Sequence, residues 1–238
     1  MENRWFITGD THGDLSRIFD FVERLDLKEN INFLILGDAG VVWRKDKKDL
    51  LNTIKELDVF NQKYNLNIYF IPGNHENFDL LDSMDRDEQT NLVYISKHLI
   101  YIPKGTVLNL PIGKCLCVGG ADSVDKMFRR KHLSWWPQEQ ITPEDIEKIP
   151  EGHYDYLFTH CTNWDTCSNF GFILYTINNV TEESRIHVSE KLLNELNKKI
   201  TYNKNYFAHY HVNKQLDEKH ICLFEDIVEL PILDKKEL

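Results

Sequence analysis

Hydrophobic residues follow two alternating patterns over residues 1–85. Short continuous hydrophobic runs are separated by stretches in which hydrophobic residues recur every three or four positions. The runs are typical of buried strands and the spaced stretches of amphipathic helices. Strands are therefore predicted at residues 5–8, 31–36 and 67–72. Strands and helices in this order indicate βαβ units and a parallel sheet.

Two amphipathic helices are predicted between these strands. Asp14 precedes the first helix and is expected to cap it, because its side chain can accept a hydrogen bond from a free N–H of the first turn. The hydrophobic positions of the first helix are Leu15, Ile18, Phe19, Val22 and Leu25. Those of the second are Leu50, Leu51, Ile54, Leu57 and Phe60.

The pattern changes from residue 92 to residue 119, where short β-rich runs follow one another without helical spacing between them. A helix is predicted at residues 142–149, because Thr142 is a favourable cap and Pro143 occupies the first turn. A further strand is predicted at residues 154–160, and it ends in a histidine.

The last part of the chain is less regular. Residues 161–180 are polar and aromatic without a clear period, which predicts a surface loop. Thr181 is expected to begin a helix, and a strand-like run follows at residues 205–211. The residues expected on one face of this helix are Ile186, Leu193, Leu196 and Ile200. The whole pattern predicts an α/β fold of two mixed sheets packed as a sandwich with helices outside, in a single domain spanning residues 1–238.

Composition narrows the functional classes. The chain has 42% hydrophobic and 28% charged residues, and a formal net charge of −10. Such a charge repels nucleic-acid phosphates and anionic lipids, which argues against a protein that coats nucleic acid non-specifically. No long hydrophobic stretch predicts a membrane span or a signal peptide, and the five irregularly spaced cysteines indicate reduced thiols. A cytoplasmic location is expected.

Nearly every predicted buried strand ends on a residue that can bind a metal ion. The residues concerned are Asp10, His12, Asp38, Asn74, His160, His209 and His211. The carboxyl ends of adjacent parallel strands open onto one crevice, so these side chains are expected to converge. Glycines precede three of them, at Gly9, Gly37 and Gly73, where a tight turn and a close backbone approach are expected.

These residues lie in five motifs, which read in order GDTHG, GD, GNHE, TH and AHYH. In this order they resemble the motifs of the calcineurin-like metallophosphoesterases, from residue 9 to residue 211. The resemblance implies one metal ion on Asp10, His12 and His211, and another on Asn74, His160 and His209. It also implies that Asp38 bridges both ions. It places His75 beside the leaving group and not among the ligands.

Imidazole and carboxylate ligands suit several divalent ions. Two ions are expected, with manganese favoured and iron, zinc, nickel or magnesium also compatible. Their charge would outweigh that of Asp10, Asp38 and a bridging hydroxide, so the site would attract a phosphate although the chain is acidic. Such a pair of ions can activate the attacking hydroxide, and His75 can donate a proton to the leaving oxygen.

The second motif departs from that of the related phosphoprotein phosphatases, which carry GDxVDRG. Val41 stands where the Asp that supports the catalytic histidine is expected, and the phosphate-binding Arg is missing. Arg129 and Arg130, with Lys126, are candidate replacements in substrate binding, and Asp122 is a candidate acidic partner for a ligand. The alternative for these four residues is an ordinary solvated loop.

Three functions are consistent with these residues. The first is hydrolysis of a phosphoester in a small molecule, nucleotide or nucleic-acid end. A diester or nucleotide is favoured, because a singly charged diester needs less of a guanidinium. The second is a phosphomonoesterase or a serine/threonine phosphoprotein phosphatase, which the missing DRG disfavours. The third is a non-catalytic scaffold, which would be expected to lose ligands that this chain retains.

Overall fold

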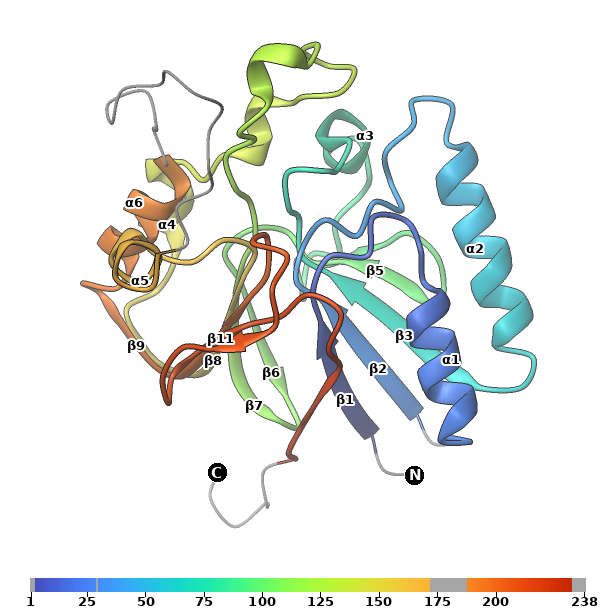
Figure 1. Ribbon diagram of the computed structural model, residues 1–238. Coiled ribbons are helices and arrows are strands. Elements are labelled where there is room, and N and C mark those ends of the chain that lie inside the picture. Colours follow the sequence, from blue (N-terminus) through green and yellow to red (C-terminus); the bar gives the residue numbers. More distant parts are fainter. Residues whose placement is uncertain (1–2, 29, 172–187, 233–238) are drawn as a thin grey trace.

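The computed structural model describes residues 3–28, 30–171 and 188–232. Two six-stranded sheets pack against each other, and helices cover their outer sides (Figure 1). Each sheet contains both parallel and antiparallel neighbours. This confirms the predicted α/β sandwich of two mixed sheets.

The first sheet is built around four parallel strands. Its spatial order is β12 (Val228–Leu230), β1 (Asn3–Thr8), β2 (Asn30–Ile35), β3 (Asn65–Phe70), β5 (Leu99–Tyr101) and β4 (Val93–Tyr94). The edge strands β12 and β4 are antiparallel to their neighbours. Its helices are α1 (Ser16–Arg24), α2 (Lys48–Phe60) and the short α3 (Phe78–Asp82), which stands beyond the carboxyl ends of the strands (Figure 1).

The second sheet also has a parallel centre and antiparallel edges. Its spatial order is β10 (Lys214–Gln215), β11 (His220–Cys222), β9 (Ile200–Phe207), β8 (Gly152–Thr159), β7 (Gly113–Val118) and β6 (Thr106–Leu110). Its helices are α4 (Pro143–Lys148), α5 (Trp164–Asn169) and α6 (Val188–Leu196). Between β7 and α4, two 3₁₀ turns lie in residues 119–141, called here the 119–141 segment: η1 (Lys126–Phe128) and η2 (Pro137–Glu139).

The central strands β1 and β2 of the first sheet are buried on both faces over most of their length. Side chains such as Trp5, Ile7 and Phe158 form the core between the sheets, while Phe6 packs on the opposite face under α1 and α2. Strands covered on both faces read as continuous hydrophobic runs, which is why the sequence shows them without alternation. Among the described residues, no helix has the length and hydrophobicity needed to cross a membrane.

The first helix differs from the sequence prediction in its cap, and the short helix α3 was not predicted. Leu15 occupies the N-cap of α1 and not Asp14. The Asp14 carboxylate still accepts a 2.9 Å hydrogen bond from the Ser16 N–H, so it satisfies one of the free donors of the first turn. The helix α3 escapes prediction because its five residues are too short to reveal a period.

The prediction for residues 161–200 is partly wrong. The helix α5 lies within the predicted loop at 161–180, and the rest of that loop from residue 172 lies outside the described residues. Thr181 and Ile186 also lie outside them, whereas Leu193 and Leu196 pack into the core as predicted. Ile200 is not helical. It is the first residue of β9. The sequence could not separate the two assignments, because a buried isoleucine fits the hydrophobic period of a helix as well as that of a strand.

Candidate metal centre

The candidate ligands follow the carboxyl ends of strands from both sheets. They are Asp10 and His12 after β1, Asp38 after β2, Asn74 after β3, His160 after β8, and His209 and His211 after β9. The strand predicted at 205–211 ends at Phe207, so the last two histidines lie in a loop. Because both sheets open toward the same crevice, the structure brings all seven residues together, and His75 with them.

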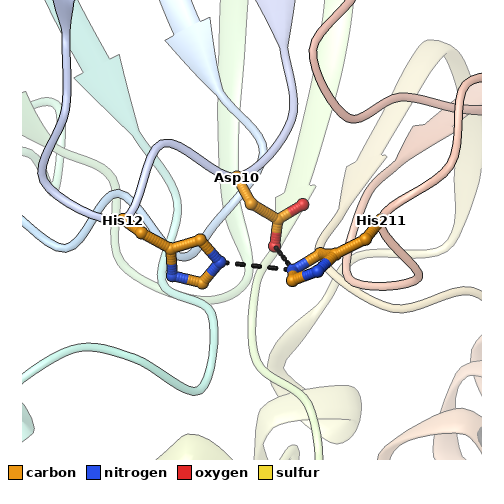
Figure 2. A group of neighbouring side chains, drawn as sticks. All are labelled: Asp10, His12 and His211. Carbon is orange, nitrogen blue, oxygen red and sulfur yellow. Dashed lines mark hydrogen bonds and ion pairs between the residues drawn. The ribbon is translucent and has the colours of Figure 1, made fainter.

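Asp10, His12 and His211 form the first group of candidate ligands (Figure 2). The Nε2 atoms of the two histidines are 3.2 Å apart, and Asp10 Oδ1 lies 3.7 Å from His211 Nε2. Asp10 Oδ1 is buried, and because His211 Nε2 is too far away for a hydrogen bond, no described residue donates one to it. A buried carboxylate oxygen without a donor is costly, so this atom suits a bound cation.

Asp38, His160 and His209 form the second group. His160 Nδ1 donates to the Leu36 carbonyl at 2.7 Å, which directs Nε2 toward the crevice. There Nε2 lies 3.3 Å from Asp38 Oδ1 and 3.3 Å from Asn74 Oδ1. These three atoms are buried, and His209, which is half-buried, adds a fourth potential ligand beside them.

Asp38 connects the two groups. Its Oδ1 accepts hydrogen bonds from the backbone N–H groups of Asn74 at 2.7 Å and His75 at 2.8 Å. Gly73 permits this approach, because a Cβ there would overlap the Asp38 carboxylate and lie 2.8 Å from His160 Nε2. His12 and His75 also lie with Asp38 in a third cluster of potential ligand atoms.

The electrostatics of the buried groups fit a cation site. Burial opposes the charge of Asp38, but the adjacent His160 holds the pKa of that carboxyl well below its usual range. Burial likewise opposes the charge of His160, yet Asp38 and Asp10 raise its pKa to about 9. Burial and the charge of His160 lower the pKa of His209 to about 3, so its ring is neutral and can coordinate. In the protein without metal, a protonated histidine thus balances the carboxylates, and a bound ion would displace that proton.

Backbone strain concentrates at the same residues. His12, Asp38, His209 and His211 have φ values of 48°, 49°, 70° and 52°. They are half of the eight non-glycine residues with positive φ in the part of the chain that is described. Each such residue costs about 1–3 kcal/mol, and such strain gathers where side-chain direction serves a function.

The neighbours of His75 differ from those of the phosphatase motif. Val41 is buried in the hydrophobic core and offers no acid. Arg129 instead donates to His75 Nε2 at 2.9 Å, and its other terminal nitrogen donates to the Asn74 carbonyl at 3.1 Å. The Arg129 Nε pairs with Asp125 Oδ1 at 2.7 Å, so the guanidinium is fixed on three sides. The Trp43 ring stacks on His75 with centroids 5.4 Å apart.

The other candidates from the 119–141 segment lie elsewhere. Lys126 places its ammonium over the Trp135 ring at 4.2 Å. Asp122 accepts hydrogen bonds from the Gln140 side chain and from the N–H of Ser189 in α6, so it ties the segment to that helix. Arg130 is exposed, and its guanidinium makes no hydrogen bond to the residues that the structure describes.

One buried acid beside the centre was not singled out from the sequence. Glu76 is fully buried, and its two oxygens accept the backbone N–H groups of Gly73 at 2.6 Å and Gly40 at 3.3 Å. It thereby fastens the loop after β2 to the loop after β3. Burial and the charge of Asp38 raise its pKa to about 8. The signal was present, since Glu76 is the last letter of the GNHE motif.

Comparison with known proteins identifies the family. The family model described as calcineurin-like phosphoesterase matches residues 4–213, so the chain belongs to this family of metal-dependent phosphoesterases. Among solved structures, it is similar to phosphopantetheinyl hydrolase (PptH) from Mycobacterium tuberculosis. The two share 13% sequence identity, with a TM-score of 0.41 over 94% of this chain and 90% of that chain. No curated protein matches the sequence.

Proposed function

We propose that this protein hydrolyses a phosphoester bond at a centre of two divalent metal ions. The observation that carries the proposal is the convergence of all seven candidate ligands in one crevice, where the buried Asp10 Oδ1 accepts no hydrogen bond from a described residue. In the proposed centre, one ion would be held by Asp10, His12 and His211. The other would be held by Asn74, His160 and His209, and Asp38 would lie between them. Manganese is the favoured ion. When bound, such ions supply Lewis-acid activation of the phosphoryl group and of the attacking water.

The protein's own residues would bind and orient the substrate. Arg129 is fixed beside His75, where its guanidinium can donate hydrogen bonds to a phosphoryl oxygen. Since an arginine only donates, His75 Nε2 carries no proton while Arg129 occupies it. If Arg129 donated this N–H to a phosphoryl oxygen instead, His75 Nε2 would be free. The negative charge of the phosphoryl group would then favour protonation of His75. The ring could then protonate the leaving oxygen.

The alternatives are less well supported. A scaffold without catalysis has no need for seven convergent ligands and the strained backbone that directs them. A phosphoprotein phosphatase is disfavoured because Val41 and its neighbour Val42 are buried in the core where the DRG residues are expected. The soluble targets in this proposal are a small phosphorylated molecule, a nucleotide or a nucleic-acid end.

A phosphomonoester is the second candidate substrate, and Arg129 favours it. The sequence favoured a diester because the second motif lacks a guanidinium. Arg129 supplies one from the 119–141 segment, so the centre can bind the extra charge of a monoester. The preference for monoesters or diesters therefore depends on how much Arg129 contributes to the binding of each substrate class.

Metal loading is the direct test of the centre. After incubation of the metal-free protein with Mn²⁺, we expect two ions per chain by elemental analysis. Anomalous diffraction is expected to locate them about 3.5–4 Å apart on either side of Asp38. Binding of fewer than two ions, or of ions away from Asp38, would contradict the proposal.

A substrate panel with Arg129 variants tests the chemistry. We expect the metal-loaded protein to hydrolyse nitrophenyl or bis-nitrophenyl phosphate, cyclic nucleotides or dinucleotides faster than phosphopeptides, with Mn, Ni, Mg and Zn each supplied in turn. Arg129→Met should lower kcat/KM for nitrophenyl phosphate by about 10–100-fold, the value of a hydrogen bond to a charged group. The loss for the bis-nitrophenyl ester should be smaller. The neighbouring Arg130→Met should have less effect on either substrate, and a preference for phosphopeptides would overturn the assignment.

A further inference from the structure

A buried chain of hydrogen bonds leads from Asn74 into the 119–141 segment. Asn74 Nδ2 donates to Ser123 Oγ at 3.2 Å, and Ser123 Oγ lies 2.9 Å from Glu139 Oε2. The exposed fractions of Asn74, Ser123 and Glu139 are 4%, 7% and 1%. Water therefore has little access to these groups, and they must satisfy one another.

The direction of each hydrogen bond in this chain is determined by Glu139. Its Oε1 accepts the backbone N–H of Ser123 at 2.8 Å and the indole N–H of Trp135 at 2.7 Å, and both groups can only donate. An ionised Glu139 can only accept, so the single hydroxyl proton of Ser123 points to Oε2. The hydroxyl oxygen is then left as an acceptor, and of the two ends of the Asn74 amide only the NH₂ can donate to it.

This arrangement leaves the amide oxygen of Asn74 on the opposite side, 3.3 Å from His160 Nε2. Asn74 is the only carboxamide among the candidate ligands, so its side chain ends in one acceptor oxygen and one donor NH₂. A flipped amide would present the NH₂ to a cation. A carboxylate has no such ambiguity, and a neutral imidazole can move its proton to the other ring nitrogen, which a carboxamide cannot do.

We propose that Ser123 and Glu139 are positioning residues that hold the Asn74 amide with its oxygen toward the metal position formed with Asp38, His160 and His209. This inference rests on the proposed function, since it assumes that an ion binds there. It assigns a role to the turn η2, which carries Glu139 and lies far from the ligand motifs in sequence.

The test is Glu139→Gln, with Mn²⁺ binding measured by isothermal titration calorimetry. The new amide can donate to Ser123 Oγ, so the hydroxyl proton is released toward Asn74, where only the amide oxygen can accept it. We expect the affinity for the ion at Asn74, His160 and His209 to fall by about 10–100-fold, as for other residues that orient metal ligands. The ion at Asp10, His12 and His211 should bind as before. Burial raises the pKa of Glu139 to about 7, so the titrations are made at pH 8, where the wild-type side chain is ionised.

Two further variants separate positioning from general damage. Asp122→Asn makes the same chemical change in the neighbouring acid, which contacts Gln140 and Ser189 and not Asn74, and it should leave both affinities unchanged. Asn74→Asp offers an oxygen in either orientation, so Glu139→Gln should cost less than about twofold in that background. Should Glu139→Gln fail to fold, Ser123→Ala removes the same link, and its effect should also vanish with Asn74→Asp.

The possible outcomes distinguish the two proposals. If the wild-type protein binds fewer than two ions, the proposed function fails. If the wild type binds two ions and Glu139→Gln binds them equally well, the positioning role is refuted. An equal loss with and without Asn74→Asp also refutes it, because the effect would then not pass through the amide.

Discussion

Replacing Asp38 with alanine is expected to abolish metal pairing and hydrolysis together. Asp38 belongs to two of the three clusters of potential ligand atoms, and its Oδ1 also accepts the backbone N–H groups of Asn74 and His75. Its loss removes a shared ligand and two of the hydrogen bonds that hold the loop after β3. Groups that act as a unit lose most of the rate when one is removed, so kcat/KM should fall by about 10³-fold or more.

The measurement is metal content per chain, taken beside kcat/KM on the best substrate of the panel. Asp58→Ala, an exposed aspartate on α2, is the matched control and should retain two ions and full activity. If Asp38→Ala kept both ions, Asp38 would not be the bridging residue, whatever the rate.

The convergence of the ligands could be predicted because the signal is local. Each ligand stands within four residues of the end of a hydrophobic strand, and the rule that parallel strands open onto one crevice needs no knowledge of tertiary contacts. The close backbone approach expected at Gly73 is also present, since the missing Cβ leaves room for the Asp38 carboxylate. Strand and motif together located Asp10 and His160 without any structure.

What the sequence could not reveal depends on contacts between distant segments. Arg129 was a candidate because of its charge, but nothing local indicates that it would contact His75, which lies 54 residues earlier. Glu139 lies in a polar stretch that is typical of a solvated turn, but in the fold it is buried and accepts the indole N–H of Trp135. Asp122 shows the opposite error, since a promising acid beside two glycines turned out to face α6.

Replacing His75 with alanine is expected to leave both metal ions bound and to slow turnover by about 10²–10⁴-fold, the usual contribution of a general acid. Burial lowers the pKa of His75, and the charge of Arg129 adds to this effect while that of Asp38 opposes it. The negative charge of a bound phosphoryl group would oppose this lowering and favour protonation of the ring.

The discriminating measurement compares leaving groups in His75→Ala. A nitrophenolate leaves readily without a proton, whereas an alkoxide such as a nucleoside hydroxyl does not, so the loss should be much smaller for nitrophenyl esters than for nucleotides. His153→Ala, at an exposed histidine that contacts Thr201, should have no effect on either. An equal loss for both classes would make His75 a positioning residue for Arg129 and Trp43. Loss of a metal ion would instead assign His75 to the cluster that it forms with His12 and Asp38, and the proton donor would have to be sought elsewhere.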